Sequence, residues 1–203
     1  MALLLANSAR KLKRADLPEV WFLTDDARTR DVLDAFMSLP RGAGVIFRHY
    51  GARDRDALAR RFAKICRARG LLFLIAEDWR LAAAIGADGV HLPECAAARG
   101  LASGARLWST RRGAFLTVAA HGPRGLARAG ILGASAALLA PVFPTQSHPD
   151  RAALGLARAA ALVRRARVPV LALGGASTRM LNCLRAAGFA GIAGISFALT
   201  GRT

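Results

Sequence analysis

The sequence lacks long hydrophobic runs and has few cysteines, and each absence excludes a class of protein. No apolar run reaches the ~18 residues that a membrane-spanning helix needs. Residues 1–6 are apolar, but the positive charges follow this stretch, whereas in a secretory signal they precede it. The three cysteines, Cys66, Cys95 and Cys183, show no CxxC spacing, which excludes a disulfide scaffold and a zinc knuckle. We therefore expect a cytoplasmic protein without a membrane partner.

Lysine and acidic residues are also scarce, and arginine dominates the charge. Against 13 acidic residues stand 30 basic ones, of which only Lys11, Lys13 and Lys64 are lysine, and the formal net charge is +17. The arginines are scattered along helical faces instead of forming one stripe with interleaved aromatic residues. This distribution argues against specific nucleic-acid binding, although a basic nucleic-acid-binding protein stays open as an alternative. Non-specific binding to polyanions at low salt is expected in any case.

Short apolar runs alternate with amphipathic stretches rich in alanine and arginine. The chain has 203 residues, of which 54% are hydrophobic, and this is enough to bury a full core. The pattern predicts strands over 20–24, 44–48, 71–76, 89–92, 115–119, 136–140, 168–173 and 191–194. It predicts helices over 31–39, 54–69, 155–165, a helix capped by Asp78 and ending at 85, one ending near 130, and one capped by Ser177. The stretch 93–112 is ambiguous and could hide a further short strand.

Eight strands that alternate with helices indicate a parallel sheet covered by helices. The sequence favours an α/β fold with a single (β/α)8 TIM barrel over residues 20–203, with a short or missing last helix. Residues 1–19 would form an N-terminal extension, partly helical, that could cover the bottom of the barrel. An open doubly wound sheet is the competing architecture, but no strand is followed by GxGxxG or GxxxxGK[ST].

In such a barrel the active site lies at the carboxyl ends of the strands. Gly174 and Gly175 follow strand seven and would let backbone N–H groups approach a ligand closely. Ile195 and Ser196 follow strand eight, where a short helix could attract an anion. These two loops predict a phosphate site. The alternative is that the glycines serve only tight turns.

Other polar residues follow the remaining strands. The loop 141–149 after strand six carries Thr145, Ser147 and His148, whose hydroxyls and imidazole could close over an anion. Arg48 after strand two could bind a phosphate bidentately, or form a structural ion pair with Asp25 or Glu77. Of the remaining candidates, Glu77 could hold Mg²⁺, Asp78 is better suited to a helix cap, and His121 and His148 could face the site as acid–base groups. His91 fits a hydrogen-bonded histidine at the rim better than a catalyst.

Several short motifs together resemble one known family. They are the segments 22–25 (FLTD), 86–92 (GADGVHL), 141–145 (PVFPT), 154–155 (LG) and 168–175 (VPVLALGG). In this combination the chain resembles the thiamine-phosphate synthase and TenI family from about Val20 to Leu199. The resemblance implies a (β/α)8 barrel and the coupling of a pyrimidine-methyl diphosphate to a thiazole phosphate with release of diphosphate.

The resemblance also implies roles for individual residues. Gly174, Gly175, Ile195 and Ser196 match the family's thiazole-phosphate site, Thr145 and Ser147 match two hydroxyl positions, and Arg48 matches the diphosphate-binding arginine. His121 would add a substrate contact. His148 stands where the family has a lysine, so Arg48 and His148 are the catalytic candidates.

The diphosphate half departs from the family pattern. Where the family has a Gln-x-Arg-x-Lys pattern after strand two, this sequence has Ile46, Arg48 and Tyr50. Where the family has Asn-Asp after strand three, it has Ala76-Glu77. The second magnesium aspartate falls on Ala96, with Glu94 nearby, and a serine falls on Ala119. Glu77 and Glu94 are therefore the candidates for Mg²⁺, in a degraded site, because a diphosphate leaving group needs metal and fixed cations.

The resemblance to the family leaves two functions open. The first is a thiamine-phosphate synthase with a rebuilt diphosphate site. The second is a non-synthase TenI-like isomerase, carrier or regulator that binds thiazole phosphate or another small phosphate ligand; the family's tautomerase histidine falls on Pro141, so that activity is not supported. Both imply a phosphorylated small molecule as partner, and a homodimer is possible.

Overall fold

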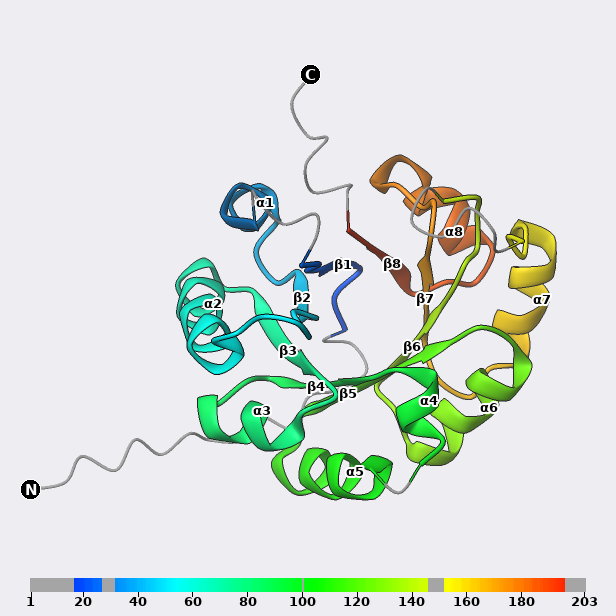
Figure 1. Ribbon diagram of the computed structural model, residues 1–203. Coiled ribbons are helices and arrows are strands. Elements are labelled where there is room, and N and C mark those ends of the chain that lie inside the picture. Colours follow the sequence, from blue (N-terminus) through cyan, green and yellow to red (C-terminus); the bar gives the residue numbers. More distant parts are fainter. Residues whose placement is uncertain (1–16, 27–31, 100, 146–151, 196–203) are drawn as a thin grey trace, which may run out of the picture.

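The strands form one closed parallel barrel, as the sequence predicts. The computed structural model describes residues 17–26, 32–99, 101–145 and 152–195. The barrel follows chain order and β8 pairs with β1, which closes it (Figure 1). The strands are β1 Val20–Leu23, β2 Gly44–Phe47, β3 Leu72–Ala76, β4 Gly89–Leu92, β5 Phe115–Ala120, β6 Ala136–Leu139, β7 Val170–Leu173 and β8 Gly191–Gly194.

Helices surround this barrel on the outside (Figure 1). They are α1 Val32–Ser38, α2 Arg55–Arg69, α3 Trp79–Ile85, α4 Glu94–Ala97, α5 Leu101–Arg112, α6 Pro123–Leu132, α7 Leu156–Arg165 and α8 Leu181–Ala186, with a 3-10 turn, η2, at Thr178–Met180. Among the described residues, no helix is long and apolar enough to cross a membrane. Of the predicted, partly helical extension over residues 1–19, the structure describes only residues 17–19, which are not helical; the predicted short or missing last helix lies outside the described residues.

The barrel interior is a packed core. Trp21, Leu23, Ile46, Leu74 and Phe115 belong to one buried cluster inside it. The Trp21 ring fills the space beside Gly44, where an added Cβ would lie 2.2 Å from a ring carbon, and it meets the Phe115 ring edge-on. Larger clusters on the outer side of the strands pack against the helices. The interior is therefore filled by side chains, and any site must lie at one of its ends.

Two local expectations are wrong. In its described residues, 93–99 and 101–112, the ambiguous stretch contains α4 and α5 and no strand, because Ala97, Ala102 and Ala105 are buried at helical spacing. Ser177 makes no side-chain cap: the Met180 N–H, which such a cap would use, donates to the Ser177 carbonyl in η2 at 3.0 Å. By contrast, the Asp78 cap is confirmed, since its carboxylate accepts from Leu81 N–H at 2.9 Å.

Candidate functional site

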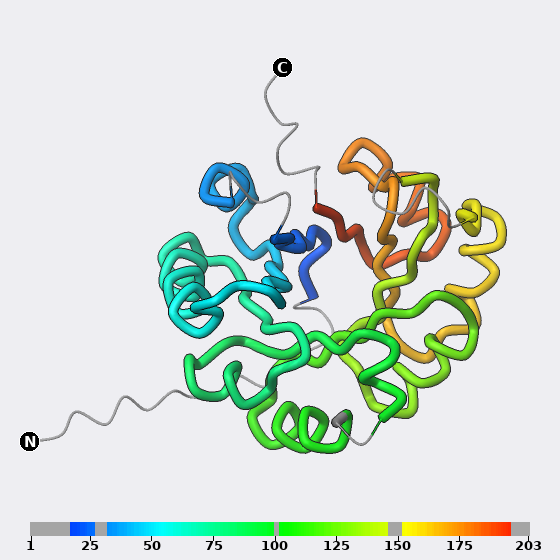
Figure 2. The backbone as a smooth tube through the Cα atoms, in the orientation of Figure 1, coloured from blue at the N-terminus to red at the C-terminus, as the bar shows by residue number. Residues whose placement is uncertain are grey.

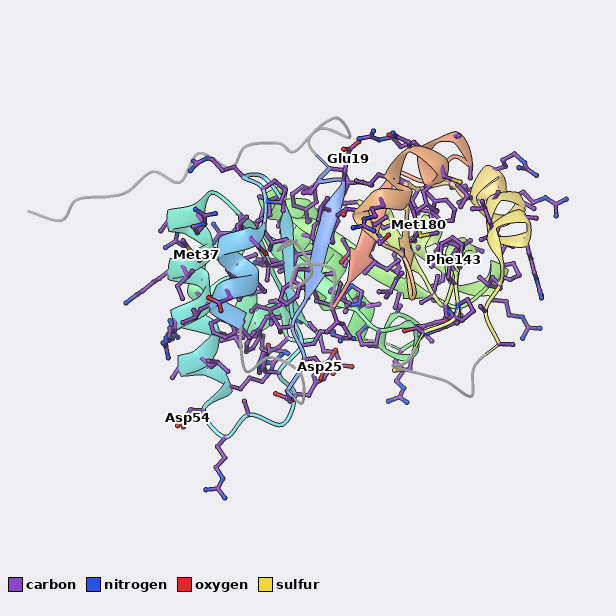
Figure 3. All side chains as sticks on the ribbon, turned by 90° about the horizontal axis from the view of Figure 1, so that it is seen from above. Glu19, Asp25, Met37, Asp54, Phe143 and Met180 are labelled. Carbon is purple, nitrogen blue, oxygen red and sulfur yellow. The ribbon has the colours of Figure 1, made fainter. Side chains whose placement is uncertain are left out.

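The carboxyl ends of the strands meet at one end of the barrel, which we call the mouth. Figure 3 shows Glu19 and Asp25 at opposite ends of β1, with Asp54, which precedes α2, at the same end as Asp25. Because all eight strands are parallel, the polar residues that follow them are brought to this end. The described candidates Arg48, Glu77, Glu94, His121, Thr145, Gly174, Gly175 and Ile195 all follow strands there.

Arg48 is anchored to the end of β1. Its Nε donates to the Thr24 carbonyl at 3.1 Å, and its Nη2 lies 3.3 Å from Oδ2 of Asp25. The Arg48 N–H donates to the Thr24 hydroxyl at 3.0 Å. Of the two alternatives for a structural ion pair, the structure therefore contains the one with Asp25. The Arg48 side chain remains 24% exposed, so its charge is presented at the mouth.

Beside Arg48, His49 is a buried histidine for which the sequence predicted no particular role. Its Nδ1 lies 2.9 Å from the Thr24 hydroxyl, and its ring stacks on Phe47 with centroids 4.9 Å apart. Burial lowers the pKa of His49, against the opposing effect of Asp26 and Asp25. A neutral His49 can accept from the Thr24 hydroxyl, whose oxygen accepts from Arg48 N–H. His49 thus belongs to the support of Arg48.

Glu77 occupies a strained backbone position at the end of β3. It has φ +66°, which a residue other than glycine rarely adopts, and its N–H donates to the His91 carbonyl at 2.8 Å. The side chain is exposed, and its carboxylate forms no ion pair among the residues that the structure describes. Burial, followed by the charge of Glu77, raises the pKa of Tyr50 to about 12. Glu77 therefore offers an available carboxylate next to Tyr50.

Glu94 and His121 contact each other across the ends of β4 and β5. Oε2 of Glu94 accepts from the His121 N–H at 3.1 Å and contacts Nδ1 of the same residue. Its other oxygen packs on the first turn of α6, where a Cβ at Gly125 would lie 2.6 Å away. The structure thus brings two predicted residues together, but as a carboxylate–imidazole pair. Among the described residues, no group of three His, Cys, Asp or Glu side chains could hold a metal ion.

The two glycines after β7 let neighbouring loops pack closely. Gly174 and Gly175 have φ +88° and +65°, and an added Cβ at Gly175 would lie 2.4 Å from the Pro144 carbonyl oxygen. Phe143 N–H donates to the Gly174 carbonyl at 3.1 Å. The turn alternative therefore accounts for both glycines, and their contact with a phosphate stays a prediction.

The remaining candidates divide between described and undescribed residues. Thr145 and Ile195 are half-buried at the mouth, and Ile195 packs on the interior cluster. Ser147, His148 and Ser196 lie outside the described residues. His91 is buried in β4, and its Nδ1 lies 2.9 Å from the Thr117 hydroxyl, which confirms a hydrogen-bonded histidine. Burial lowers the pKa of His91 to about 3, with a smaller effect of Arg48.

Comparison with known proteins gives one consistent family. The family model described as thiamine monophosphate synthase matches residues 22–198. A thiamine-phosphate synthase of Salinispora arenicola is 38% identical over 154 residues, covering 70% of this chain and 68% of the relative. A thiamine-phosphate synthase of Bordetella avium is 33% identical over 156 residues, covering 73% of this chain and 70% of the relative.

Solved structures show the same fold. A thiamine phosphate pyrophosphorylase from Pyrococcus furiosus superposes with a TM-score of 0.73 at 22% identity, over 90% of this chain and 87% of that one. A 3-hexulose-6-phosphate synthase superposes with a TM-score of 0.61 at 16% identity, over 87% and 88%. At this identity the structures support the barrel alone. The sequence match over almost all of the barrel carries the assignment: this chain belongs to the thiamine monophosphate synthase family.

Proposed function

We propose that the protein is a cytoplasmic thiamine-phosphate synthase. It would join a pyrimidine-methyl diphosphate to a thiazole phosphate, the bond to the diphosphate oxygen breaking with its electron pair retained by the leaving diphosphate. The observation that carries this proposal is the family match over 22–198, which spans every strand from β2 to β8 and the second half of β1. A role in thiamine biosynthesis follows from the family; turnover by this chain is the part that needs testing.

The charge that develops on the diphosphate calls for fixed cations at the mouth. Arg48 would meet this charge, since it is anchored through Thr24 and partly exposed. A magnesium ion that arrives with the diphosphate would neutralise it further, and such an ion needs only one or two protein carboxylates beside phosphate oxygens. Glu77 fits that requirement because its carboxylate is exposed and available, whereas the carboxylate of Glu94 is shared with His121.

The thiazole phosphate would bind at the opposite side of the mouth. We assign its phosphate to the backbone of Gly174, Gly175, Ile195 and Ser196, with Thr145, Ser147 and His148 closing over it from the β6 loop. His121, held by Glu94, would add a contact from the end of β5. In this arrangement the His148 imidazole would stand where the family has a lysine.

A second candidate function has a specific observation in its favour. The positive charge of Arg48 is partly offset by Asp25, and Tyr50 stands where the family has a lysine. The loss of this lysine removes a fixed cation from the diphosphate side, whereas Gly174, Gly175, Ile195 and Ser196 keep the family's residues at the phosphate side. A non-synthase member that binds thiazole phosphate as an isomerase, carrier or regulator is therefore the alternative.

One experiment separates these functions. The full chain would be incubated with both precursors and Mg²⁺, and thiamine phosphate measured by chromatography, while calorimetry measures thiazole-phosphate binding. Formation of thiamine phosphate at a rate proportional to protein supports the synthase. Binding of thiazole phosphate without turnover supports the alternative, and absence of both contradicts the two proposals together.

Two partner assignments accompany the proposal. We propose no specific nucleic-acid partner, so binding to duplex DNA should disappear at ~0.2 M salt, as expected for a purely electrostatic contact. Retention at that salt would contradict this assignment. A homodimer is also proposed, and sedimentation at micromolar concentration would give twice the 21.4 kDa mass of the chain if it forms.

A further inference from the structure

Arg55 connects two loops at the mouth through backbone carbonyls. It is the first residue of α2, and its Nε donates to the His49 carbonyl at 3.0 Å. Its Nη2 donates to the Ala76 carbonyl at 2.8 Å, and its Nη1 lies 3.7 Å from Oδ2 of Asp78. The side chain is only 18% exposed, and its guanidinium lies over the Phe47 ring. One side chain therefore links the loop after β2 to the loop after β3.

The two carbonyls that Arg55 binds adjoin the diphosphate candidates. His49 directly follows Arg48, and Ala76 directly precedes Glu77. The Ala76 carbonyl also accepts from Asp78 N–H at 2.9 Å, which forms a three-residue turn with Glu77 at its centre. A residue with a positive φ keeps that conformation only where its surroundings fix it. Arg55 holds the carbonyl of the Ala76–Glu77 peptide and the His91 carbonyl holds the N–H of the same peptide, so its orientation is fixed at both ends.

The planar guanidinium is the feature that allows this linkage. Its Nε and Nη2 donors are held in one plane, so together they reach the carbonyl of His49, after β2, and that of Ala76, the last residue of β3. A lysine ammonium at the same position keeps the charge but offers a single donor centre on a flexible stem. The role is therefore geometric, and the charge of Arg55 is already opposed by Asp78.

We propose that Arg55 is a positioning residue for the diphosphate half of the site. It sets the relative position of Arg48 and Glu77 without touching the substrate itself. This inference rests on the proposed synthase function for its kinetic consequence. The sequence does not reveal it, because Arg55 resembles the other arginines of α2 until its carbonyl partners are known.

The test compares Arg55→Gln and Arg55→Lys with the control Arg60→Gln, which changes an exposed arginine on the same helix. We expect both Arg55 variants to raise KM for the diphosphate substrate about ten- to a hundredfold, the effect of misplacing reacting groups. KM for thiazole phosphate should stay within about twofold, and Arg60→Gln should match the wild type. An Arg55→Lys enzyme with wild-type kinetics, or an equal loss for both substrates, would overturn the proposal.

A second measurement does not need turnover. Amide hydrogen exchange at Glu77 and Asp78 should become faster in Arg55→Lys than in the wild type, while exchange in the barrel strands is unchanged. Unaltered exchange at both amides overturns the proposal. If the wild type forms no thiamine phosphate, the synthase function fails separately, and this exchange together with calorimetric binding of inorganic diphosphate decides the role of Arg55. If Arg55→Gln does not fold, Arg55→Lys alone carries the comparison.

Discussion

Arg48 and Asp25 form an ion pair that is partly exposed at the barrel mouth. Pairs with this exposure contribute little to stability, because water and salt screen them. Thr24 holds Arg48 more directly than this pair does, because its carbonyl and its hydroxyl both accept hydrogen bonds from Arg48. A phosphate group that arrives at the mouth can therefore compete with Asp25 without unfolding the site. The pair is compatible with binding an anion.

Arg48→Gln should lower kcat/KM of the synthase reaction by about 10²–10³, the typical loss when one group that stabilises developing charge is removed. The thermal midpoint should change little, since the Asp25 pair is exposed. Steady-state assays with both substrates measure the effect. Arg53→Gln, at an exposed arginine in the following loop, is the matched control. A kcat/KM equal to that of the control would show that Arg48 does not meet the diphosphate.

Glu77→Gln and Glu94→Gln should separate the two carboxylates proposed for metal. Glu77 has an available carboxylate, so its loss should raise the Mg²⁺ concentration for half-maximal activity about 10–100-fold. Glu94 is engaged by His121, so its amide variant should leave that concentration within about twofold. Titration of activity with Mg²⁺ gives both values. A larger shift for Glu94→Gln would assign the metal to Glu94.

At the scale of elements, the loops after β6 and β7 are fitted to each other. Phe143 and Pro144 lie against Gly175, and Val142 N–H donates to the Leu173 carbonyl at 3.0 Å. The position of one loop therefore depends on the other. If a phosphate bound to the β7 loop shifted that loop, the β6 loop, which carries Thr145, would shift with it.

Gly175→Ala should weaken this pairing of loops. The added Cβ would lie 2.4 Å from the Pro144 carbonyl oxygen at φ +65°, so we expect a loss of about 1–3 kcal/mol of unfolding free energy. Thiazole-phosphate affinity should fall as well. Gly122→Ala is the control, since Gly122 is extended and nothing lies within 4 Å of its Cβ position. Urea unfolding and calorimetry measure both quantities; equal stability of the two variants would contradict the expectation.

The sequence predicted the elements wherever apolar periodicity was strong. The strands and α2 follow from such patterns, and residues directly after a strand reach the mouth by topology. The sequence left the stretch 93–112 ambiguous because its alanine, glycine and serine residues give only a weak apolar periodicity. The links made by Arg55, and the contact of Glu94 with His121, depend on backbone carbonyls and loops that only the folded chain brings together.

For the whole molecule, buried histidines make stability depend on pH. His91 has a pKa of about 3 in the fold and an ordinary value of 6.5 when unfolded. Below pH 6.5 the unfolded chain therefore binds a proton that the fold does not. The stabilising effect of neutral His91 is full above pH 6.5 and is lost as the pH falls towards 3. His49 acts in the same direction, whereas Asp88, whose pKa burial raises, acts in the opposite one.

His91→Gln should reduce this dependence. Between pH 6 and 4 we expect the wild type to lose up to about 1.4 kcal/mol per pH unit from His91 alone, and the variant to lose correspondingly less. Urea unfolding at pH 7, 6, 5 and 4 gives the slopes for both proteins. Since His49 and Asp88 are common to both, the difference in slope reports His91. Parallel slopes would show that the pKa of His91 is the same in the folded and the unfolded chain.

The junction of β1 with β8 has a consequence for synthesis of the chain. Ile192 N–H donates to the Glu19 carbonyl at 2.7 Å, and Arg185 Nε donates to the Glu19 carboxylate at 2.9 Å; Figure 2 shows the first and last strands side by side. On the ribosome, β1 emerges long before β8, the strand that pairs with this edge of it. At roughly 5–20 residues per second, the edge of β1 that β8 covers stays unpaired for about 8 to 35 seconds. Translation speed thus sets how long the nascent chain is exposed to mispairing and to chaperones.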